Sequence, residues 1–338
     1  MDHALPALDV REYQCHSICI GTHCYYCAVL RDHSKKEAVQ DMKIKQIFAV
    51  AGYNFRQWHK NSRIIITFCL SFILCFLLSD KTVQFAKEYH TIMQVLEPFI
   101  WTFGDANSIL LSSLLLVLLF ADMPFISTGT PFYLMRIDRK TWVLGQAVYI
   151  IAATSIYLFF VLISTSLVCM VQSFGGNMWS ETAAILGYSR AGEAVALPAF
   201  VKTLEMTTPY ACTTSIFLLM LFYTLLMVSI MLLFNLKKGP IGGVTSVFAF
   251  SLYGFLLNPQ TIKTILGIPD HLMYKANVIM GWLSPLNHAT YHMHNFGYDL
   301  LPRMWQTYLI FGILIVLCFY LSLRAVNKYN FHFTGTEG

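Results

Sequence analysis

Six long apolar runs divide the sequence, and a polar segment separates each run from the next. They cover residues 64–78, 109–126, 143–170, 213–233, 244–257 and 305–323. A helix of about 20 apolar residues crosses the roughly 30 Å hydrocarbon core of a bilayer. The pattern therefore predicts an all-α integral membrane protein with six transmembrane helices. The run at 244–257 is short, which favours a tilted or partly protein-buried helix.

An amphipathic pattern precedes the first run. Ile44, Phe48, Ala51 and Phe55 fall on one face of a helix that starts at Met42. Such a pattern is typical of an interfacial helix lying along the membrane surface.

The apolar periodicity begins at Met42, and we divide the chain into three parts accordingly. Residues 1–41 have no apolar periodicity and no signal-peptide pattern, so we expect a poorly structured segment there. Residues 42–330 would form the six-span domain, and residues 331–338 a C-terminal tail. The sequence leaves open whether translation starts at Met1 or at Met42.

Two further apolar pieces precede the last run. Residues 274–283 and 285–294 are each too short to cross a bilayer. We expect them to form re-entrant helices or helices on the outer surface, because irregular backbone at membrane depth needs protein or water around it.

The composition agrees with a membrane protein. Hydrophobic residues make up 56% of the chain and charged residues 12%, whereas soluble domains carry about 25% charged residues. Lysine and arginine concentrate in the two terminal segments and in the loops after the second and fourth runs. Basic loops remain cytoplasmic, so we expect both termini in the cytosol and the chain in a plasma membrane, that of a bacterial cell. Basic residues that flank membrane spans set the topology and contact anionic lipid, which accounts for the net charge of +5. We therefore expect no nucleic-acid partner.

The motifs of several enzyme classes are absent from the sequence. No Gly-x-x-x-x-Gly-Lys-Ser/Thr, His-Glu-x-x-His or Gly-x-Ser-x-Gly occurs. We therefore expect no catalytic residues and no cofactor bound by this chain, and a membrane-embedded enzyme lacks the nucleophile or acid pair that it would need.

Two groups of Cys and His residues contain side chains that can bind a metal, but neither group has the complete spacing pattern of a metal site. Cys24-x-x-Cys27, with Cys15 and Cys19, could form a structural zinc site, but the usual distant second pair is missing. His288 and His292 lie four residues apart near His294, again with no carboxylate or cysteine nearby. An unstructured tail and a membrane interface are the favoured interpretations, so we expect no metal site.

The polar segment between the second and third runs carries the most informative pattern. Phe132, Met135 and Arg139 fall on one helical stripe, with Arg136 and Lys140 beside it, as in a short amphipathic helix on the membrane surface. Either a basic topology signal or a docking helix would have this pattern. Asp122, at the end of the second run, is an ionisable group at membrane depth, and both a functional role and simple capping remain open.

The motifs around this segment resemble a known family. Asp122-x-Pro-Phe125, followed by Arg136-x-x-Arg139-x-x-Trp142-x-x-Gly-Gln146, is similar to the second-to-third span connection of type 2 ABC (ATP-binding cassette) transporter permeases. Hydropathy resembles that family over residues 42–330.

The resemblance implies a permease subunit of an exporter. Its substrate would cross between two such subunits, the same or related, and a separate ATP-binding subunit would hold ATP and Mg. The loop would be a coupling helix against that subunit, formed by Phe132, Tyr133, Met135, Arg136, Arg139, Lys140 and Trp142. A non-transporting immunity or sensing protein that binds a peptide or lipid remains the alternative.

Overall fold

The computed structural model describes residues 23–125, 135–189, 191–194, 197 and 199–329. It is 81% helical, which confirms the predicted all-α class in its coarse form. The longer helices are α1 (His23–Arg56), α2 (Ser62–Glu88), α4 (Ala106–Phe120), α6 (Arg139–Cys169), α10 (Pro209–Leu256) and α14 (Met304–Ala325). The shorter ones are α3 (Glu97–Phe103), α7 (Glu181–Tyr188), α8 (Ala191–Ala194), α9 (Val201–Met206), α11 (Pro259–Leu266), α12 (Met273–Leu283) and α13 (Pro285–Ala289). Single 3-10 turns are η1 (Trp58–Lys60), η2 (Met170–Gln172), η3 (Asp270–Leu272), η4 (Tyr291–Met293) and η5 (Val326–Lys328).

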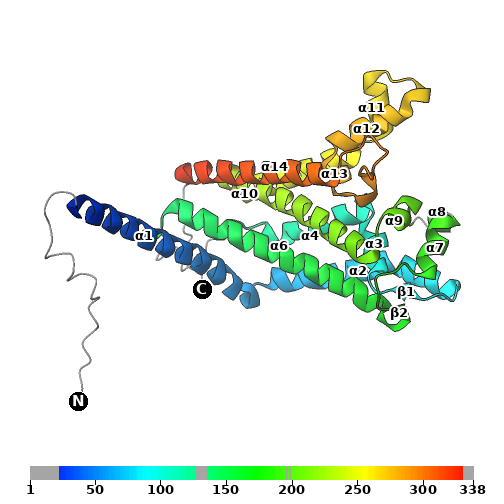
Figure 1. Cartoon of the computed structure of the whole chain (residues 1–338), viewed down its shortest axis with the longest axis horizontal. Helices are drawn as coiled ribbons and strands as arrows, with labels where there is room; N and C mark the ends of the chain where they lie inside the picture. Colours follow the sequence, from blue (N-terminus) through cyan, green and yellow to red (C-terminus); the bar gives the residue numbers. More distant parts are fainter. Residues whose placement is uncertain (1–22, 126–134, 190, 195–196, 198, 330–338) are drawn as a thin grey trace, which may run out of the picture.

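The long helices form an elongated bundle (Figure 1). Within the described residues, four helices are long and apolar enough to cross a membrane: α2, α6, α10 and α14. The pair α3 and α4, bent by 90°, could supply a fifth crossing. The chain is therefore compatible with a multi-pass membrane protein, as its apolar runs predict.

The fourth and fifth apolar runs lie in one long element, α10. Its 48 residues would extend about 72 Å as a straight helix, more than twice the hydrocarbon thickness. Gly239, at φ 78° and ψ −179°, interrupts the helix directly before Pro240. A Cβ added to Gly243 would lie 1.7 Å from Asn235 Oδ1, yet residues eight apart on a straight helix are about 12 Å apart. The two parts of α10 therefore turn back on each other at Gly239.

α1 packs along α6 through a close contact. A Cβ on Gly145 of α6 would lie 2.6 Å from Val50 Cβ and 3.0 Å from the Ile47 carbonyl oxygen. Asn54 Nδ2 donates to Gln146 Oε1 at 2.9 Å, and this bond is buried. The missing side chain of Gly145 thus lets the two backbones approach, and a polar pair fixes their register.

The structure corrects one prediction for this helix. α1 begins at His23, so residues 23–41 are helical and the break expected at Met42 does not occur. On the predicted apolar face Ala51 is 4% exposed, Ile44 is 44% exposed and Phe48 is 62% exposed, so other parts of the chain cover only part of that face. The face that α6 covers is defined by Val50 and Asn54 instead.

Short elements cover one end of the bundle (Figure 1). β1 (Met93–Gln94) and β2 (Ser173–Phe174) pair in parallel there. The Glu97 carboxylate of α3 accepts the Ser180 backbone N–H at 2.8 Å and the Ser180 hydroxyl at 2.5 Å. These bonds fasten α3 to the start of α7.

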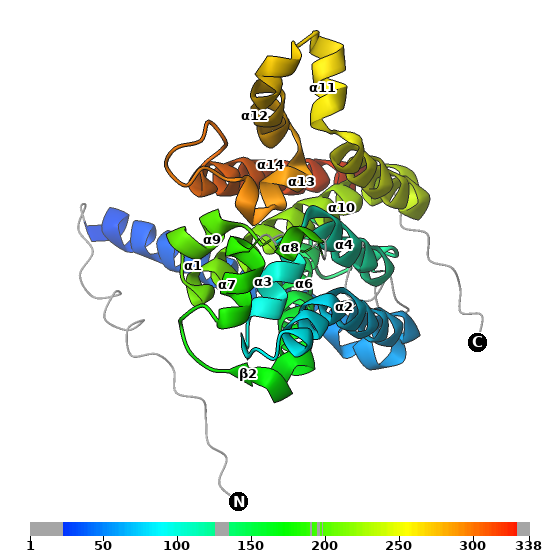
Figure 2. The same cartoon turned by 90° about the vertical axis from the view of Figure 1, so that its right-hand side faces the viewer.

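The two short apolar pieces predicted before the last span are helices in the structure. The first corresponds to α12, and the second begins with α13, whose Leu286 is buried. α11 and α12 form an arm that stands away from the bundle in both views (Figures 1 and 2). α13 contacts α10 and α4 and belongs to the bundle.

Candidate coupling surface

The segment expected to couple to a partner is described from Met135 onward, and Phe132 and Tyr133 lie outside the described residues. Residues 135–138 form a turn and a bend, and α6 begins directly after them at Arg139. Met135 is 78% exposed, and Arg136 and Lys140 are exposed beside it. The predicted helix through Trp142 is thus interrupted in its described part: a turn precedes the first turn of α6.

Arg139 contacts the C-terminal part of this same chain. Its Nη1 donates to the carbonyl oxygens of Asn327 and Tyr329, each at 3.2 Å, and to that of Val326 at 3.4 Å. The last carbonyls of a helix have no partner within the helix, and a guanidinium can satisfy several of them. Arg139 therefore joins the start of α6 to the end of α14 and η5.

Trp142 lies in the hydrophobic core. It is 0% exposed, and Val143 beside it is 1% exposed. An indole in this position packs against other parts of its own chain. Of the described residues expected to face a partner, Met135, Arg136 and Lys140 remain as an exposed group, which we call the coupling surface.

Other basic residues gather at the same end of the bundle. Lys237 and Lys238 are exposed directly before the turn at Gly239. Arg324 and Lys328 are exposed where α14 and η5 end, next to Arg139. This end is therefore positively charged over three turns that are distant in the sequence.

Asn235 connects the turn of α10 to the end of α4. Its Nδ2 donates to the Met123 carbonyl at 2.6 Å and to the Ala121 carbonyl at 3.3 Å, directly after α4. The sequence pattern did not indicate a role for Asn235, although an asparagine between an apolar run and a glycine-rich turn was a usable signal.

Asp122 forms an ion pair with Arg63, in the first turn of α2. The two side chains are about half exposed, at 52% for Asp122 and 54% for Arg63. In the structure, Asp122 thus holds the end of α4 to the start of α2. Arg63 was missed because 59 positions separate it from Asp122.

Two histidines of the predicted cluster meet at one hydroxyl on α14. His288 Nδ1 lies 2.8 Å and His294 Nε2 lies 3.0 Å from Thr307 Oγ1. His294 Nδ1 donates to the Thr290 carbonyl at 3.0 Å. Burial lowers the pKa of His294 to about 4 and also lowers the pKa of His288. Both rings are buried links between segments rather than exposed interface residues.

His292, expected to share a face with His288, points elsewhere. Its ring stacks on Phe200 of the α9 segment, with centroids 4.1 Å apart. Within the described ranges, no group of three or more His, Cys, Asp or Glu side chains could hold a metal ion.

The four N-terminal cysteines are only partly covered by the structure. Cys15 and Cys19 lie outside the described residues. Cys24 and Cys27 fall in the first turns of α1, where the positions of side chains are not described. The zinc hypothesis for this group therefore stays a prediction.

Comparison with known proteins identified no relative of this chain. No protein-family model, no curated protein and no solved structure matches the chain. A functional assignment therefore depends on the residues and contacts described above.

Proposed function

We propose that this chain is the membrane subunit of an ABC exporter that acts with a second permease subunit and a separate ATP-binding subunit. The observation that carries the proposal is the coupling surface: Met135 and Arg136 are exposed on a turn directly before α6, at the basic end of a helical bundle. Met and Arg are both enriched in protein interfaces.

The proposed topology has six crossings with both termini in the cytosol. They are α2, the α3–α4 pair, α6, the two parts of α10 on either side of Gly239, and α14. The basic end would be cytoplasmic by the positive-inside rule.

The packing of the bundle supports a pathway between subunits. Its interior contains large, fully buried side chains, among them Trp101, Trp142, Tyr149, Tyr157 and Tyr223. A substrate would have to displace such residues to pass through one chain. Between two chains it would need only a separation of their apolar outer surfaces, which can close again afterwards.

The orientation can be tested by labelling introduced cysteines with a membrane-impermeant reagent. In intact cells we expect labelling of Glu88→Cys and His271→Cys, which are exposed near the end opposite the coupling surface, and none of Lys238→Cys. The unsubstituted chain gives the background of its own cysteines. Labelling of Lys238→Cys from outside would contradict the topology.

The coupling role can be tested with paired variants. We expect Met135→Ala and Arg136→Ala to leave the chain folded in the membrane, and each to weaken co-purification of a Walker A ATPase by about tenfold or more. Lys237→Ala, at another turn of the same end, is the control and should do less. If both variants retain a full complement of ATPase and normal ATP-dependent transport, the coupling surface is only a basic connector.

Arg139→Ala tests whether Arg139 acts within its own chain or on the ATPase partner. Because Arg139 bonds this chain's own carbonyls, its loss should loosen the end of α14 before it affects any partner. Loss of the ATPase without loosening of residues 326–329 would contradict this assignment.

A further inference from the structure

A cavity of about 400 Å³ opens at the end of the bundle opposite the coupling surface. It lies where α2 ends and where η2 follows α6, beside the β1–β2 pair (Figure 1). Its volume is within the range of roughly 300–1,000 Å³ that is usual for small-ligand sites. Lys87 and His90 line it, and no aspartate or glutamate does among the described residues.

Some polar groups of this cavity already have a hydrogen-bond partner among the residues that the structure describes, and others have no such partner or no ion pair there. The Thr91 hydroxyl is hydrogen-bonded to that of Thr182 at 2.7 Å, and the Ser173 hydroxyl donates to the Met170 carbonyl. In the described part of the chain, neither Lys87 nor His90 forms an ion pair, and Gln172 Oε1 is buried without a donor. The cavity thus offers an ammonium and an imidazole N–H to a ligand, whereas the buried Gln172 Oε1 is not accessible from it.

The backbone holds His90 in an unusual conformation. His90 has a φ of 53°, and it is the one non-glycine residue with positive φ in the described ranges. It occupies the position after a helix where glycine is usual, and the Thr91 N–H closes the turn on the Ala86 carbonyl at 3.0 Å. A side chain retained where glycine fits better is a reason to look for a role of that side chain.

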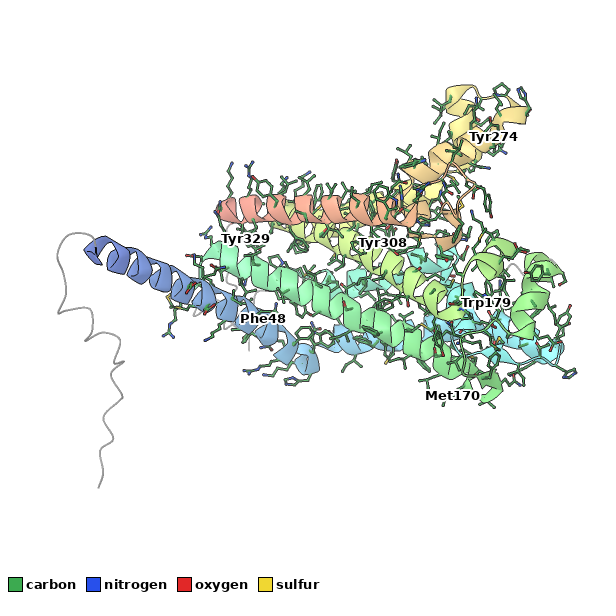
Figure 3. The ribbon with its side chains drawn as sticks, viewed as in Figure 1. Phe48, Met170, Trp179, Tyr274, Tyr308 and Tyr329 are labelled. Carbon is green, nitrogen blue, oxygen red and sulfur yellow. The ribbon has the colours of Figure 1, made fainter. Side chains whose placement is uncertain are left out.

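The surroundings of the cavity match the level of lipid headgroups. α2 and α6 are both able to cross a membrane, and both end beside the cavity. Val171 is 96% exposed and Met170 is 65% exposed at its edge, and Figure 3 labels Met170 at the end of α6. Apolar side chains beside a cationic groove suit a molecule with both an acyl chain and an anionic head.

We propose that this groove binds the phosphodiester headgroup of an anionic phospholipid. Lys87 and His90 donate to the phosphate oxygens. A soluble phosphate ester offers the same phosphate chemistry but no acyl chain for Met170 and Val171, so the lipid is the favoured occupant. The site does not depend on the proposed export function.

The test uses the purified full chain in detergent, with three probes measured by calorimetry or native mass spectrometry. The probes are short-chain phosphatidylglycerol, short-chain phosphatidylcholine and glycerol 3-phosphate. Phosphatidylglycerol should bind about tenfold more tightly than the other two, because Lys87 repels the choline ammonium of phosphatidylcholine and glycerol 3-phosphate has no acyl chain.

Variants then locate the site. Lys87→Gln and His90→Gly should each weaken phosphatidylglycerol binding about tenfold, while Lys81→Gln, an exposed lysine on the same helix, should not. Because glycine tolerates the φ of residue 90, His90→Gly should melt no earlier than the unsubstituted chain, so lost binding cannot be attributed to unfolding.

Three results would overturn the proposal. Equal binding by the unsubstituted chain, Lys87→Gln and His90→Gly would remove the site. Glycerol 3-phosphate binding as tightly as the lipid would exclude a lipid occupant, and equal binding of phosphatidylcholine would exclude selection of an anionic headgroup.

Discussion

The contact between Asn235 and Gly243 at the turn of α10 allows a quantitative prediction. A Cβ at residue 243 would lie 1.7 Å from Asn235 Oδ1, 2.5 Å from its Cγ and 2.8 Å from the Met231 carbonyl oxygen. Since one of these atoms belongs to the backbone, the clash cannot be relieved by side-chain rotation alone. We expect Gly243→Ala to lower the free energy of unfolding by about 3 kcal/mol, the upper part of the range for overpacking.

Removing Asn235 has its own consequence. Asn235→Ala deletes the hydrogen bonds to the carbonyls of Met123 and Ala121, which should lower the free energy of unfolding by about 1–3 kcal/mol. It also deletes two of the three atoms that a methyl group at position 243 would meet. In the double variant Gly243→Ala should therefore cost about 1–2 kcal/mol less than it does alone.

Unfolding by SDS in detergent micelles, followed by circular dichroism, can measure all four members of this cycle. Gly52→Ala is the matched control, because a Cβ there meets nothing within 4 Å, and alanine in a helix should be neutral or slightly stabilising. If the effects of Gly243→Ala and Asn235→Ala add to within about 0.5 kcal/mol, the two halves of α10 do not meet as described.

Three further outcomes follow from single contacts. Arg139→Ala should raise amide hydrogen exchange at residues 326–329 about tenfold, whereas Lys140→Ala should not; equal exchange in both would refute the link to α14. His294, outside the membrane-crossing helices, is kept neutral by burial with a pKa near 4 against 6.5 when unfolded, so stability should be constant above pH 6.5 and fall as the pH drops toward 4. The slope attributable to this ring, at most about 1.4 kcal/mol per pH unit, should disappear from pH-dependent unfolding of His294→Gln, and an unchanged slope would contradict the assignment. Gly145→Leu should separate α1 from α6, detected as faster proteolysis of α1, and unchanged proteolysis would argue against the close contact at Val50.

Apolar periodicity was sufficient to predict the helical class and most of the long helices. It did not predict the extent of α1, because residues 34–41 are largely helix-forming polar residues without an apolar stripe. Nor could it show which face of α1 is covered, since that depends on the absent side chain of Gly145 on a distant helix.

The candidate site was less predictable than the fold. A helical projection places Arg139 on one stripe with Phe132 and Met135, but it does not show that the guanidinium meets carbonyls 187 to 190 positions later. The burial of Trp142 could not be predicted from the sequence either, because a residue at the start of a helix can face either a partner or the core. Contacts of this kind depend on how helices meet in three dimensions, which one sequence does not contain.

The hydrogen bonds of Arg139 make the first turn of α6 and the last turn of α14 a single mechanical unit. A force applied to the turn at residues 135–138 acts on α6 directly, and it reaches α14 through the Arg139 guanidinium as well as through the packing of α6 on α14 and η5. Whatever pushes on that turn must therefore either shift both helices together or break the three bonds. Those bonds therefore add to the packing of the two helices in opposing any movement of α6 that α14 does not follow.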